Sequence, residues 1–374
     1  MKSHLHLACA ALLGPLAVVQ GAPQASTSSA SPTTTSFVPS GGLGTAPTPV
    51  PVYNPMSDFD FASLTLTLYQ EYIELDLFNH GLAMFSAQDF EDAGISAEDQ
   101  YLIQFMGEQE TGHAQLVTNI LSPQNASTMC NYSYPFQTVR DFVDFSLKIT
   151  RVGESGTFGF LEHLDSRASA ALLLESISTE SRQEMVFRQL EGLFPMPFWF
   201  TPAITQSMQW SWIAPYITSC PESNQRIQWQ NFPALNVTNP PNASVLTNET
   251  MPAITHNRST PLSQPGYQLN LTWDSPGKQV GPNNSYTTST SAGAAKYAAW
   301  ISQLNTTYTA LDNLNGNSAT TEQPGGNVFG NNTAPTVNGT IFVLIVDDNP
   351  YVTPFNLSLL NEHVVAGPAL YVAG

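Results

Sequence analysis

The sequence predicts a four-helix bundle with one long crossover, followed by a small, mainly β C-terminal module. Over residues 57–195, apolar side chains recur at spacings of three and four, which is the period of an amphipathic helix. From about residue 265, the pattern changes to the alternation that is typical of strands. Between the second and third predicted helices lies a connection long enough to cross the bundle. The 374 residues provide enough chain for two hydrophobic cores.

The first 56 residues are predicted to lie outside any core. Residues 1–21 have the features of a secretory signal peptide, because Lys2 precedes an apolar run that is too short to span a bilayer. Residues 22–56 are rich in Ser, Thr, Pro and Gly, and we expect a disordered, O-glycosylated linker there. No later stretch approaches about 20 uninterrupted apolar residues, so no membrane insertion is expected. The protein is therefore predicted to be secreted, into the medium or the cell wall.

The first two helices set the topology of the bundle. The first carries an apolar stripe over residues 64–82, and the second begins at Ser96 and ends before Pro123. Residues 123–135 then form a connection that reaches roughly 40 Å when extended. The second helix, residues 97–121, is roughly 37 Å long. The connection can therefore run the full length of the bundle, which favours a single-crossover topology over a simple up-and-down one.

The third and fourth helices complete the bundle. The third begins near Phe136, and we expect it to bend or break where Gly153, Gly156 and Gly159 follow one another. The fourth runs from about Ser166 and ends near residue 192.

Residues 196–264 are predicted to form an aromatic cap over one end of the bundle and a Pro/Asn-rich connection. The alternative is a surface on which carbohydrate stacks. The aromatic residues concerned are Phe198, Trp199, Phe200, Trp210, Trp212, Tyr216 and Trp229. Residues 265–374 are predicted to form the β module, with strands at 267–273 and 340–346 and one short helix at about 292–304.

Cysteines and glycosylation sequons agree with export. Cys9 lies in the signal peptide, and Cys130 and Cys220 remain as a pair that we expect to form a disulfide, the alternative being two unrelated thiols. The density of Asn-x-Ser/Thr sequons indicates N-glycosylation. They occur at Asn125, Asn131, Asn236, Asn242, Asn248, Asn257, Asn270, Asn283, Asn305, Asn331, Asn338 and Asn356.

The formal net charge of −18 results from a scarcity of Lys and Arg. Without a basic patch, the chain is not expected to bind nucleic acid or anionic membranes. Cell-wall polysaccharide and wall proteins remain as expected partners.

Polar residues on stripes that should be apolar indicate a metal site. Glu71, Glu110, His113 and Glu180 all fall on core-facing positions of predicted helices. Glu110 and His113 form a Glu-x-x-His motif, which places a carboxylate and an imidazole on one helical face, as bundles that bind two metal ions require. This donor set suits iron or manganese better than copper(I). The alternative is that His113 hydrogen-bonds Glu110 in a metal-free core.

The helical motifs resemble the ferritin-like family related to rubrerythrin. The similar segments are residues 68–82, 108–113, 153–159 and 178–182. The C-terminal segments 338–343, 353–358 and 365–371 resemble fungal secreted stress-response and late sexual development proteins, in which this tail follows a ferritin-like domain.

Two positions depart from the pattern of that family. Thr150 stands where the resemblance implies a third-helix glutamate, and Gln183 stands where it implies the histidine of a second Glu-x-x-His. Glu154 and Glu184 lie one turn from Thr150 and from Glu180 and are weaker candidates to replace them. The further weaker candidates are Glu74 and Gln183. We therefore expect a single-metal or metal-free bundle rather than a full two-metal site.

The remaining polar residues are predicted to be structural. Histidines 80, 163, 256 and 363 lack partners at ligand spacing, and Asp347-Asp348 is interpreted as a solvated strand end, with calcium binding as the alternative. No phosphate-binding loop or nucleophile motif identifies a catalytic residue.

The sequence thus leaves three hypotheses. The first is a metal-binding, oxidoreductase-like protein that uses iron or manganese. The second is a non-catalytic cell-wall or spore-surface protein with a metal-free bundle. The third is a carbohydrate-binding protein that uses its Trp cluster.

Overall fold

The structure is a computed structural model and describes residues 50–242, 260–331 and 333–374. The predicted signal peptide and residues 22–49 of the predicted linker lie outside the described residues, as do Asn248, His256 and Asn257. The side chain of Asn305 lies outside them too. Those predictions stay predictions.

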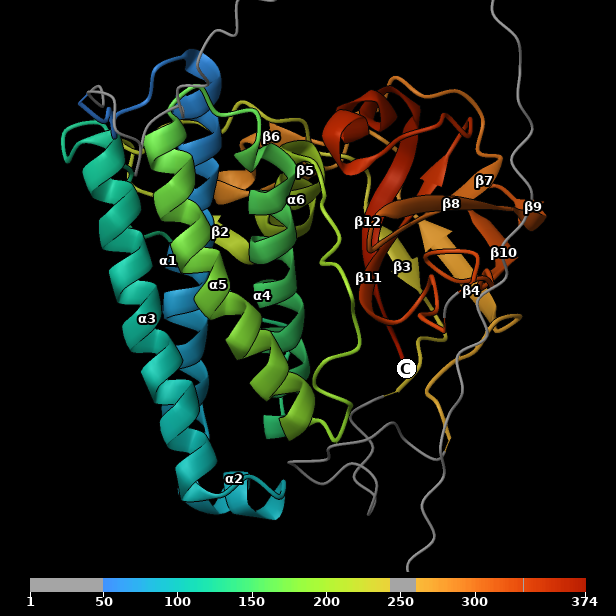
Figure 1. Cartoon of the computed structure of the whole chain (residues 1–374), viewed down its shortest axis with the longest axis horizontal. Coiled ribbons are helices and arrows are strands. Elements are labelled where there is room, and N and C mark those ends of the chain that lie inside the picture. Colours follow the sequence, from blue (N-terminus) through green and yellow to red (C-terminus); the bar gives the residue numbers. More distant parts are fainter. Residues whose placement is uncertain (1–49, 243–259, 332) are drawn as a thin grey trace, which may run out of the picture. The chain divides into compact units, whose positions relative to one another are not determined.

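Four long helices and one short helix form the bundle (Figure 1). They are α1 (Asp58–Met84), α2 (Ala87–Asp92), α3 (Ala97–Leu121), α4 (Val139–Leu161) and α5 (Arg167–Leu190). Each long helix begins after a Ser or Thr whose side-chain oxygen accepts a hydrogen bond from a first-turn backbone N–H, which stabilises the start of the helix. None of the described helices is long and apolar enough to cross a membrane.

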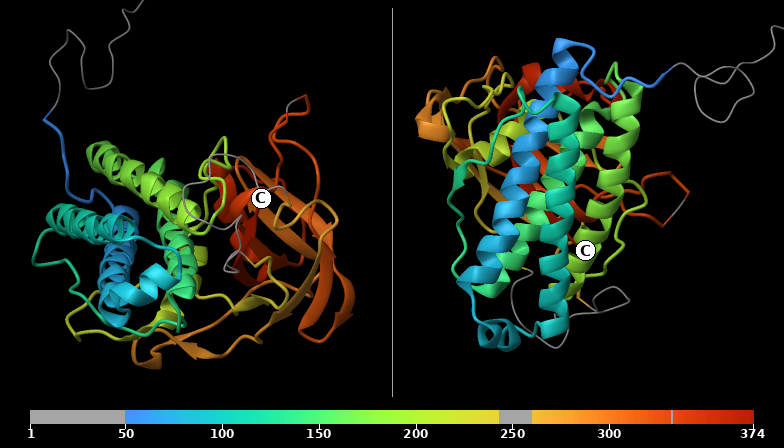
Figure 2. Two further views of the ribbon diagram at one scale, coloured as in Figure 1. Left: turned by 90° about the horizontal axis from the view of Figure 1, so that it is seen from below. Right: turned by 90° about the vertical axis from the view of Figure 1, so that its left-hand side faces the viewer.

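The connection between α3 and α4 runs along the length of the bundle, so the predicted single crossover is confirmed (Figure 2, right). It contains β1 (Asn131–Tyr132), which pairs antiparallel with β2 (Ile217–Ser219). Next to this pairing, Cys130 and Cys220 form the expected disulfide across a sequence separation of 90. Closing so long a loop stabilises the fold by about 2–4 kcal/mol.

The third helix is predicted to bend or break at its three glycines, and the break is wrong, because α4 continues through them to Leu161. The glycines instead allow a neighbouring segment to pack against the helix. A Cβ atom at Gly156 would lie 2.3 Å from the side-chain amide carbon of Gln209, and one at Gly159 would lie 1.7 Å from the carbonyl oxygen of Ile204. Close packing therefore outweighs the low helix propensity of glycine here.

The aromatic segment packs along the side of the bundle rather than over one end. Its ordered parts are α6 (Gln206–Ile213) and the 3₁₀ helix η1 (Ala214–Tyr216). The Trp210 ring lies 6.0 Å from that of Tyr69 in α1, and the Trp212 ring lies 5.6 Å from that of Phe145 in α4. The groove left by the α4 glycines explains the difference from the predicted cap.

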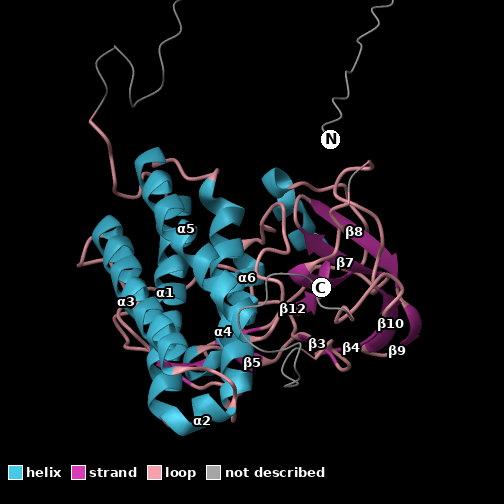
Figure 3. Cartoon of the chain, turned by 60° about the horizontal axis from the view of Figure 1, so that its bottom comes forward, coloured by secondary structure: helices cyan, strands magenta, loops and turns pink. Residues whose placement is uncertain are grey.

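The C-terminal part is mainly β, as predicted (Figure 3), and its strands pair antiparallel. One four-stranded sheet has the order β3 (Leu235–Val237), β4 (Gln268–Trp273), β10 (Ser318–Glu322) and β9 (Asp312–Asn315). The other has the order β12 (Val364–Ala373), β11 (Gly339–Val346), β7 (Tyr297–Ser302) and β8 (Asn305–Ala310). β5 (Gln279–Val280) pairs with β6 (Tyr286–Thr287), and two further 3₁₀ helices, η3 (Pro282–Asn284) and η4 (Pro354–His363), lie in connections.

Strand β7 corrects the prediction of a helix at about 292–304. Its alanines favour a helix locally, but the strand pairs with β8 on one side and with β11 on the other. Trp300 and Ala298 face the core between the two large sheets, while Ala299 and Ile301 face the helices. Burial on both faces explains why the segment shows no clear alternation of polar and apolar residues.

The helices share a hydrophobic core with one face of the β12-β11-β7-β8 sheet, and a second core lies between the two large sheets. Every residue of β11 is buried. Ile341, Val343 and Ile345 pack between the two sheets, whereas Phe342 and Leu344 join the core of the helices. Residues 51–374 accordingly form one compact unit.

Candidate metal centre

Three helices bring four predicted ligands together in the middle of the bundle. Glu71 comes from α1, Glu110 and His113 from α3, and Glu180 from α5, and all four are buried. One potential ligand atom of each lies within 4.8 Å of those of the others. We call these four residues the carboxylate–histidine cluster. The spacing of Glu110 and His113 places both on the inner face of α3, as the sequence predicted.

The hydrogen bonds of His113 turn its Nδ1 atom toward the carboxylates. The Thr179 hydroxyl donates to the carbonyl oxygen of Ser176 at 2.7 Å, so its oxygen accepts from the Nε2–H of His113 at 2.9 Å. Nδ1 then lies 3.0 Å from Glu110 Oε2 and 3.4 Å from Glu71 Oε2. A neutral ring in this tautomer would present its Nδ1 lone pair to a cation, and the hydrogen bond to Thr179 holds the ring in that orientation.

Burial makes the cluster a poor place for uncompensated negative charge. It raises the pKa of Glu71 to about 7, against the lowering effect of His113. Burial, together with Glu71 and Glu74, raises the pKa of Glu180 well above its usual value. For His113, burial lowers the pKa, but the hydrogen bonds to Glu110 and Glu71 raise it to about 12. The cluster therefore holds protons tightly, which a bound cation would displace.

Several buried oxygen atoms around the cluster have no hydrogen-bond partner within the described part of the chain. They are Glu74 Oε2, Thr150 Oγ1, Glu180 Oε2 and Gln183 Oε1. Unpaired buried oxygens are unfavourable and are normally matched by water or a cation. Three carboxylates, one imidazole and these oxygens form a hard, mixed O/N donor set, which fits iron or manganese.

Two weaker candidates, Glu74 and Gln183, lie beside the cluster without belonging to it. Gln70 Nε2 donates to Glu74 Oε1 at 2.6 Å, and this carboxylate points at α4, where a Cβ atom on Gly153 would lie 2.5 Å from it. Burial and the charges of Glu110 and Glu71 raise the pKa of Glu74 well above its usual value. Gln183 donates its Nε2 to Glu110, which orients that carboxylate.

The other two weaker candidates, Glu154 and Glu184, do not join the cluster, so the prediction that they replace missing ligands is wrong. Both form ion pairs with Arg151, which lies 2.9 Å from Glu184 through Nη2 and also contacts Glu154. Ser181 donates a further hydrogen bond to Glu154 at 2.6 Å. We call Arg151, Glu154 and Glu184 the arginine cluster. Sequence reasoning missed Arg151, because nothing in the pattern of α4 indicates which α5 residues face it.

The positions expected to complete a second metal site hold neutral side chains. Thr150 and Gln183 are both buried, and neither offers a charged ligand. Thr179 and Gln70 were also missed by the sequence analysis. The only available signal was spacing, since Thr179 directly precedes Glu180 and Gln70 stands four residues before Glu74.

The histidines predicted to be structural have protein partners where the structure describes them. His163 Nε2 lies 3.0 Å from the carbonyl oxygen of Phe355, and the His80 ring contacts that of Tyr134. His363 Nδ1 lies 2.9 Å from Asp347, which also accepts from a backbone N–H. Asp347 thus uses its carboxylate within the fold, which favours the strand-end interpretation over calcium binding.

Fold and site together define a ferritin-like helical bundle with a buried carboxylate and histidine centre. Residues 57–193 match the family model described as "Ferritin-like domain". The chain is also 52% identical over 349 residues to Protein rds1 of Schizosaccharomyces pombe, a match that covers 90% of this chain and 86% of that protein. The chain therefore belongs to the family of Protein rds1 and contains a ferritin-like domain.

Proposed function

We propose that this protein is a secreted, glycosylated ferritin-like protein that binds one iron or manganese ion at Glu71, Glu110, His113 and Glu180. The observation that carries the proposal is the convergence of these four side chains, with unpartnered carboxylate oxygens, in a buried part of the bundle. An iron or manganese ion bound there would supply one-electron redox chemistry. The resemblance of the C-terminal tail supports a role in stress response or development.

The donor set supports one ion rather than two. Glu71 and the Glu110/His113 pair bring ligands from α1 and α3, and Glu180 adds one from α5. A second ion would need charged or imidazole ligands near Thr150 and Gln183, and neither residue provides one. The protein's own residues also exclude water from the site, since all four ligands are buried.

Secretion and glycosylation rest on the signal-like N-terminus, the disulfide and the sequons. Within the described residues, Asn125, Asn131, Asn236, Asn242, Asn270, Asn283 and Asn331 are exposed, as glycan carriers must be. Asn338 and Asn356 are half-buried and use their side-chain amides in hydrogen bonds to Pro197 and Thr353. We therefore place the glycans on the exposed group.

Metal analysis tests the proposal directly. The protein is purified from a secreting host, stripped with a chelator and reloaded with Fe(II) or Mn(II) under anaerobic conditions, and bound metal per chain is then measured after gel filtration. We expect one ion per chain. A chain that retains no ion under these conditions contradicts the proposal.

The neutral residues Thr150 and Gln183 favour one second candidate function. In it the bundle is a metal-free scaffold of a cell-wall or spore-surface protein, and the glycans and β module make the interactions. Retention of the folded, chelator-treated protein on isolated cell walls, together with no bound metal, would support this alternative.

A further inference from the structure

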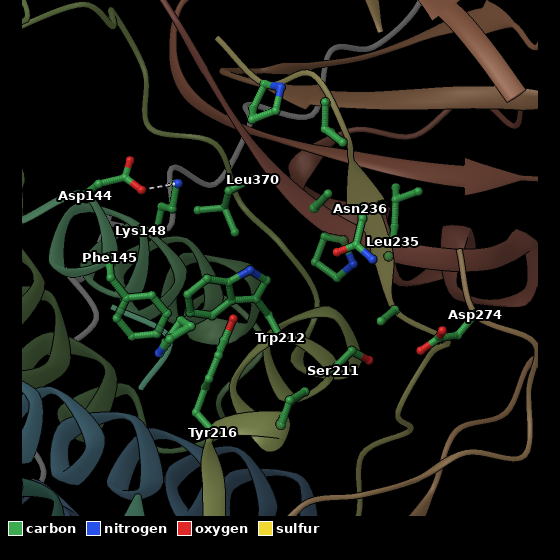
Figure 4. A pocket seen from close by; sticks show the side chains of 18 of the residues that line it. Asp144, Phe145, Lys148, Ser211, Trp212, Tyr216, Leu235, Asn236, Asp274 and Leu370 are labelled. Carbon is green, nitrogen blue, oxygen red and sulfur yellow. Dashed lines mark hydrogen bonds and ion pairs between the residues drawn. The ribbon is translucent and has the colours of Figure 1, made fainter. Parts of the chain in front are cut away.

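A cleft separate from the metal centre lies among α4, α6 and the β module (Figure 4). Its first lobe has a volume of about 570 Å³ and its second a volume of about 430 Å³. The two lobes share five lining residues, so they form one continuous groove: Ser211, Pro215, Ala234, Asp274 and Lys278. Each volume lies in the range of small-molecule sites.

The first lobe has an aromatic wall. Phe145, Trp212 and Tyr216 line it, with the Trp212 ring 5.6 Å from Phe145 and 5.2 Å from Tyr216. Phe145 is buried and packs against the rings of Trp212 and Tyr216, which are half-buried. The wall thus presents a rigid aromatic surface with polar tips, the kind that combines apolar contact with hydrogen bonding.

The charges in the cleft largely cancel. Lys148 forms an ion pair with Asp144, and Lys278 lies 2.9 Å from Asp274. Asp141 is the remaining charged residue of the lining, and it accepts a hydrogen bond from the Thr138 hydroxyl. With both lysines neutralised, the cleft favours an uncharged ligand over a polyanion or a polycation.

The second lobe contains a buried amide without a partner. Asn231 lines this lobe with only 4% of its surface exposed. Neither its Oδ1 nor its Nδ2 has a hydrogen-bond partner within the described part of the chain. A buried amide in this state calls for a ligand that both donates and accepts hydrogen bonds.

We propose that this cleft binds a neutral oligosaccharide. A sugar ring has an apolar C–H face that suits the aromatic wall, and its hydroxyl groups both donate and accept, as Asn231 requires. With both lysines paired and Asp141 as the one further charge of the lining, the cleft matches a neutral polymer better than an acidic or a basic one. Two connected lobes provide room for several linked sugars.

One competing occupant is the chain's own N-glycan. Asn236 begins a sequon, lies exposed on β3 and lines the first lobe. It does not line the second lobe, where the unpartnered amide of Asn231 lies. The free oligosaccharide is therefore the better match to both lobes, and the attached glycan becomes an outcome of the test.

The test measures binding of defined hexasaccharides to the purified full chain by calorimetry and by Trp fluorescence. The probes are neutral hexamers of glucose, N-acetylglucosamine and mannose, with a galacturonic acid hexamer as the charged comparison. The variants are Trp212→Ala and Asn231→Asp, and Trp199→Ala is the matched control, since Trp199 is 55% exposed and does not line the cleft. Circular dichroism and the thermal midpoint check that each variant folds.

We expect at least one neutral hexamer to bind and Trp212→Ala to weaken it about tenfold or more. Asn231→Asp keeps the side-chain size but removes the N–H donors, so it tests the second lobe even if Trp212→Ala does not fold. Trp199→Ala should bind as the wild type does. The proposal is overturned if no neutral hexamer binds, if only the galacturonic acid hexamer binds, or if neither cleft variant weakens binding. It is equally overturned if the Asn236→Gln variant binds a neutral hexamer while the wild type, which carries a glycan at Asn236, does not. That result would mean that the chain's own glycan occupies the cleft.

Discussion

Two buried acidic clusters lie in the same bundle, and they differ in the source of their positive charge. On α5, Glu180 belongs to the carboxylate–histidine cluster, and Glu184, one turn later, belongs to the arginine cluster. In the arginine cluster, Arg151 pairs with two carboxylates and stacks over the Phe198 ring at 4.7 Å. In the other, three carboxylates face the single imidazole of His113.

The difference shows why only one of the two is a candidate for metal. Buried carboxylates are tolerated when a cation neutralises them and hydrogen bonds satisfy their oxygens. The arginine cluster carries its cation as part of the chain, so it needs no other. The carboxylate–histidine cluster has more negative charge than His113 can balance, so it must take up protons or a metal ion.

Removing a ligand of the carboxylate–histidine cluster should have the largest effect. Glu110→Ala and His113→Ala each remove a buried ligand, and we expect iron or manganese affinity to fall by at least about a thousandfold, or about 4 kcal/mol. The amount of metal bound per chain after reloading at a series of metal concentrations measures this loss of affinity. Glu154→Gln in the arginine cluster is the control and should still hold one ion. If the control loses its ion as readily as the ligand variants, the two clusters are not separate in function.

Restoring the two neutral positions should create a second site. In the double variant Thr150→Glu and Gln183→His, a carboxylate and an imidazole are added beside the cluster, and we expect bound metal to rise from one ion to two per chain. Gln183 already contacts Glu110, so its replacement lies within reach of the same carboxylates. Thr150→Gln with Gln183→Asn is a neutral control. A folded double variant that holds only one ion would show that backbone placement, not residue type, limits the site.

In the presence of a chelator, removing one carboxylate should change the free energy of unfolding in opposite directions in the two clusters. Glu154→Ala leaves the buried Arg151 with one partner fewer, and it should lower the free energy of unfolding by about 3 kcal/mol. Glu180→Gln removes a buried carboxyl group whose charged form is disfavoured by burial and by its acidic neighbours, and it should raise the free energy of unfolding by about 1 kcal/mol. Urea titration of the metal-free proteins measures both. Destabilisation by Glu180→Gln to the same extent as Glu154→Ala would contradict the comparison.

The sequence could predict the bundle, its crossover and the four clustered residues, because each depends on helical period or on connection length. It could not assign Glu154 and Glu184, since Glu184 lies on the same stripe of α5 as Glu180, and Glu154 lies one turn after Thr150 on α4. Only the side-by-side packing of α4 and α5 shows that Arg151 faces them. The mistaken helix at 292–304 has a similar cause, because strand pairing to β8 and β11 overrode the local preference of its alanines.

The contrast between the carboxylate–histidine cluster and the arginine cluster also predicts how the stability of the metal-free protein depends on pH. Burial raises the pKa of Glu71 from 4.5 to about 7, so the native state binds more protons than the unfolded chain between these values. Stability therefore falls as pH rises through this window, by about 1 kcal/mol per pH unit. The raised pKa of His113 extends the decline above pH 6.5, because the folded state retains a proton that the unfolded chain loses.

Urea midpoints at pH 5, 6 and 7 in the presence of a chelator measure this slope, and the variant Glu71→Gln supplies the control. The variant lacks the titrating carboxylate, so its slope between pH 5 and 7 should be smaller than that of the wild type. Loading the wild type with Mn(II) should also flatten the slope, because the cation displaces the protons that the empty cluster holds. The arginine cluster contains Arg151 as its built-in cation, so Glu154→Gln should leave the slope unchanged. A metal-free wild type whose stability rises from pH 5 to 7 would mean that the cluster is neutralised by something other than protons, and the comparison between the two clusters would fail.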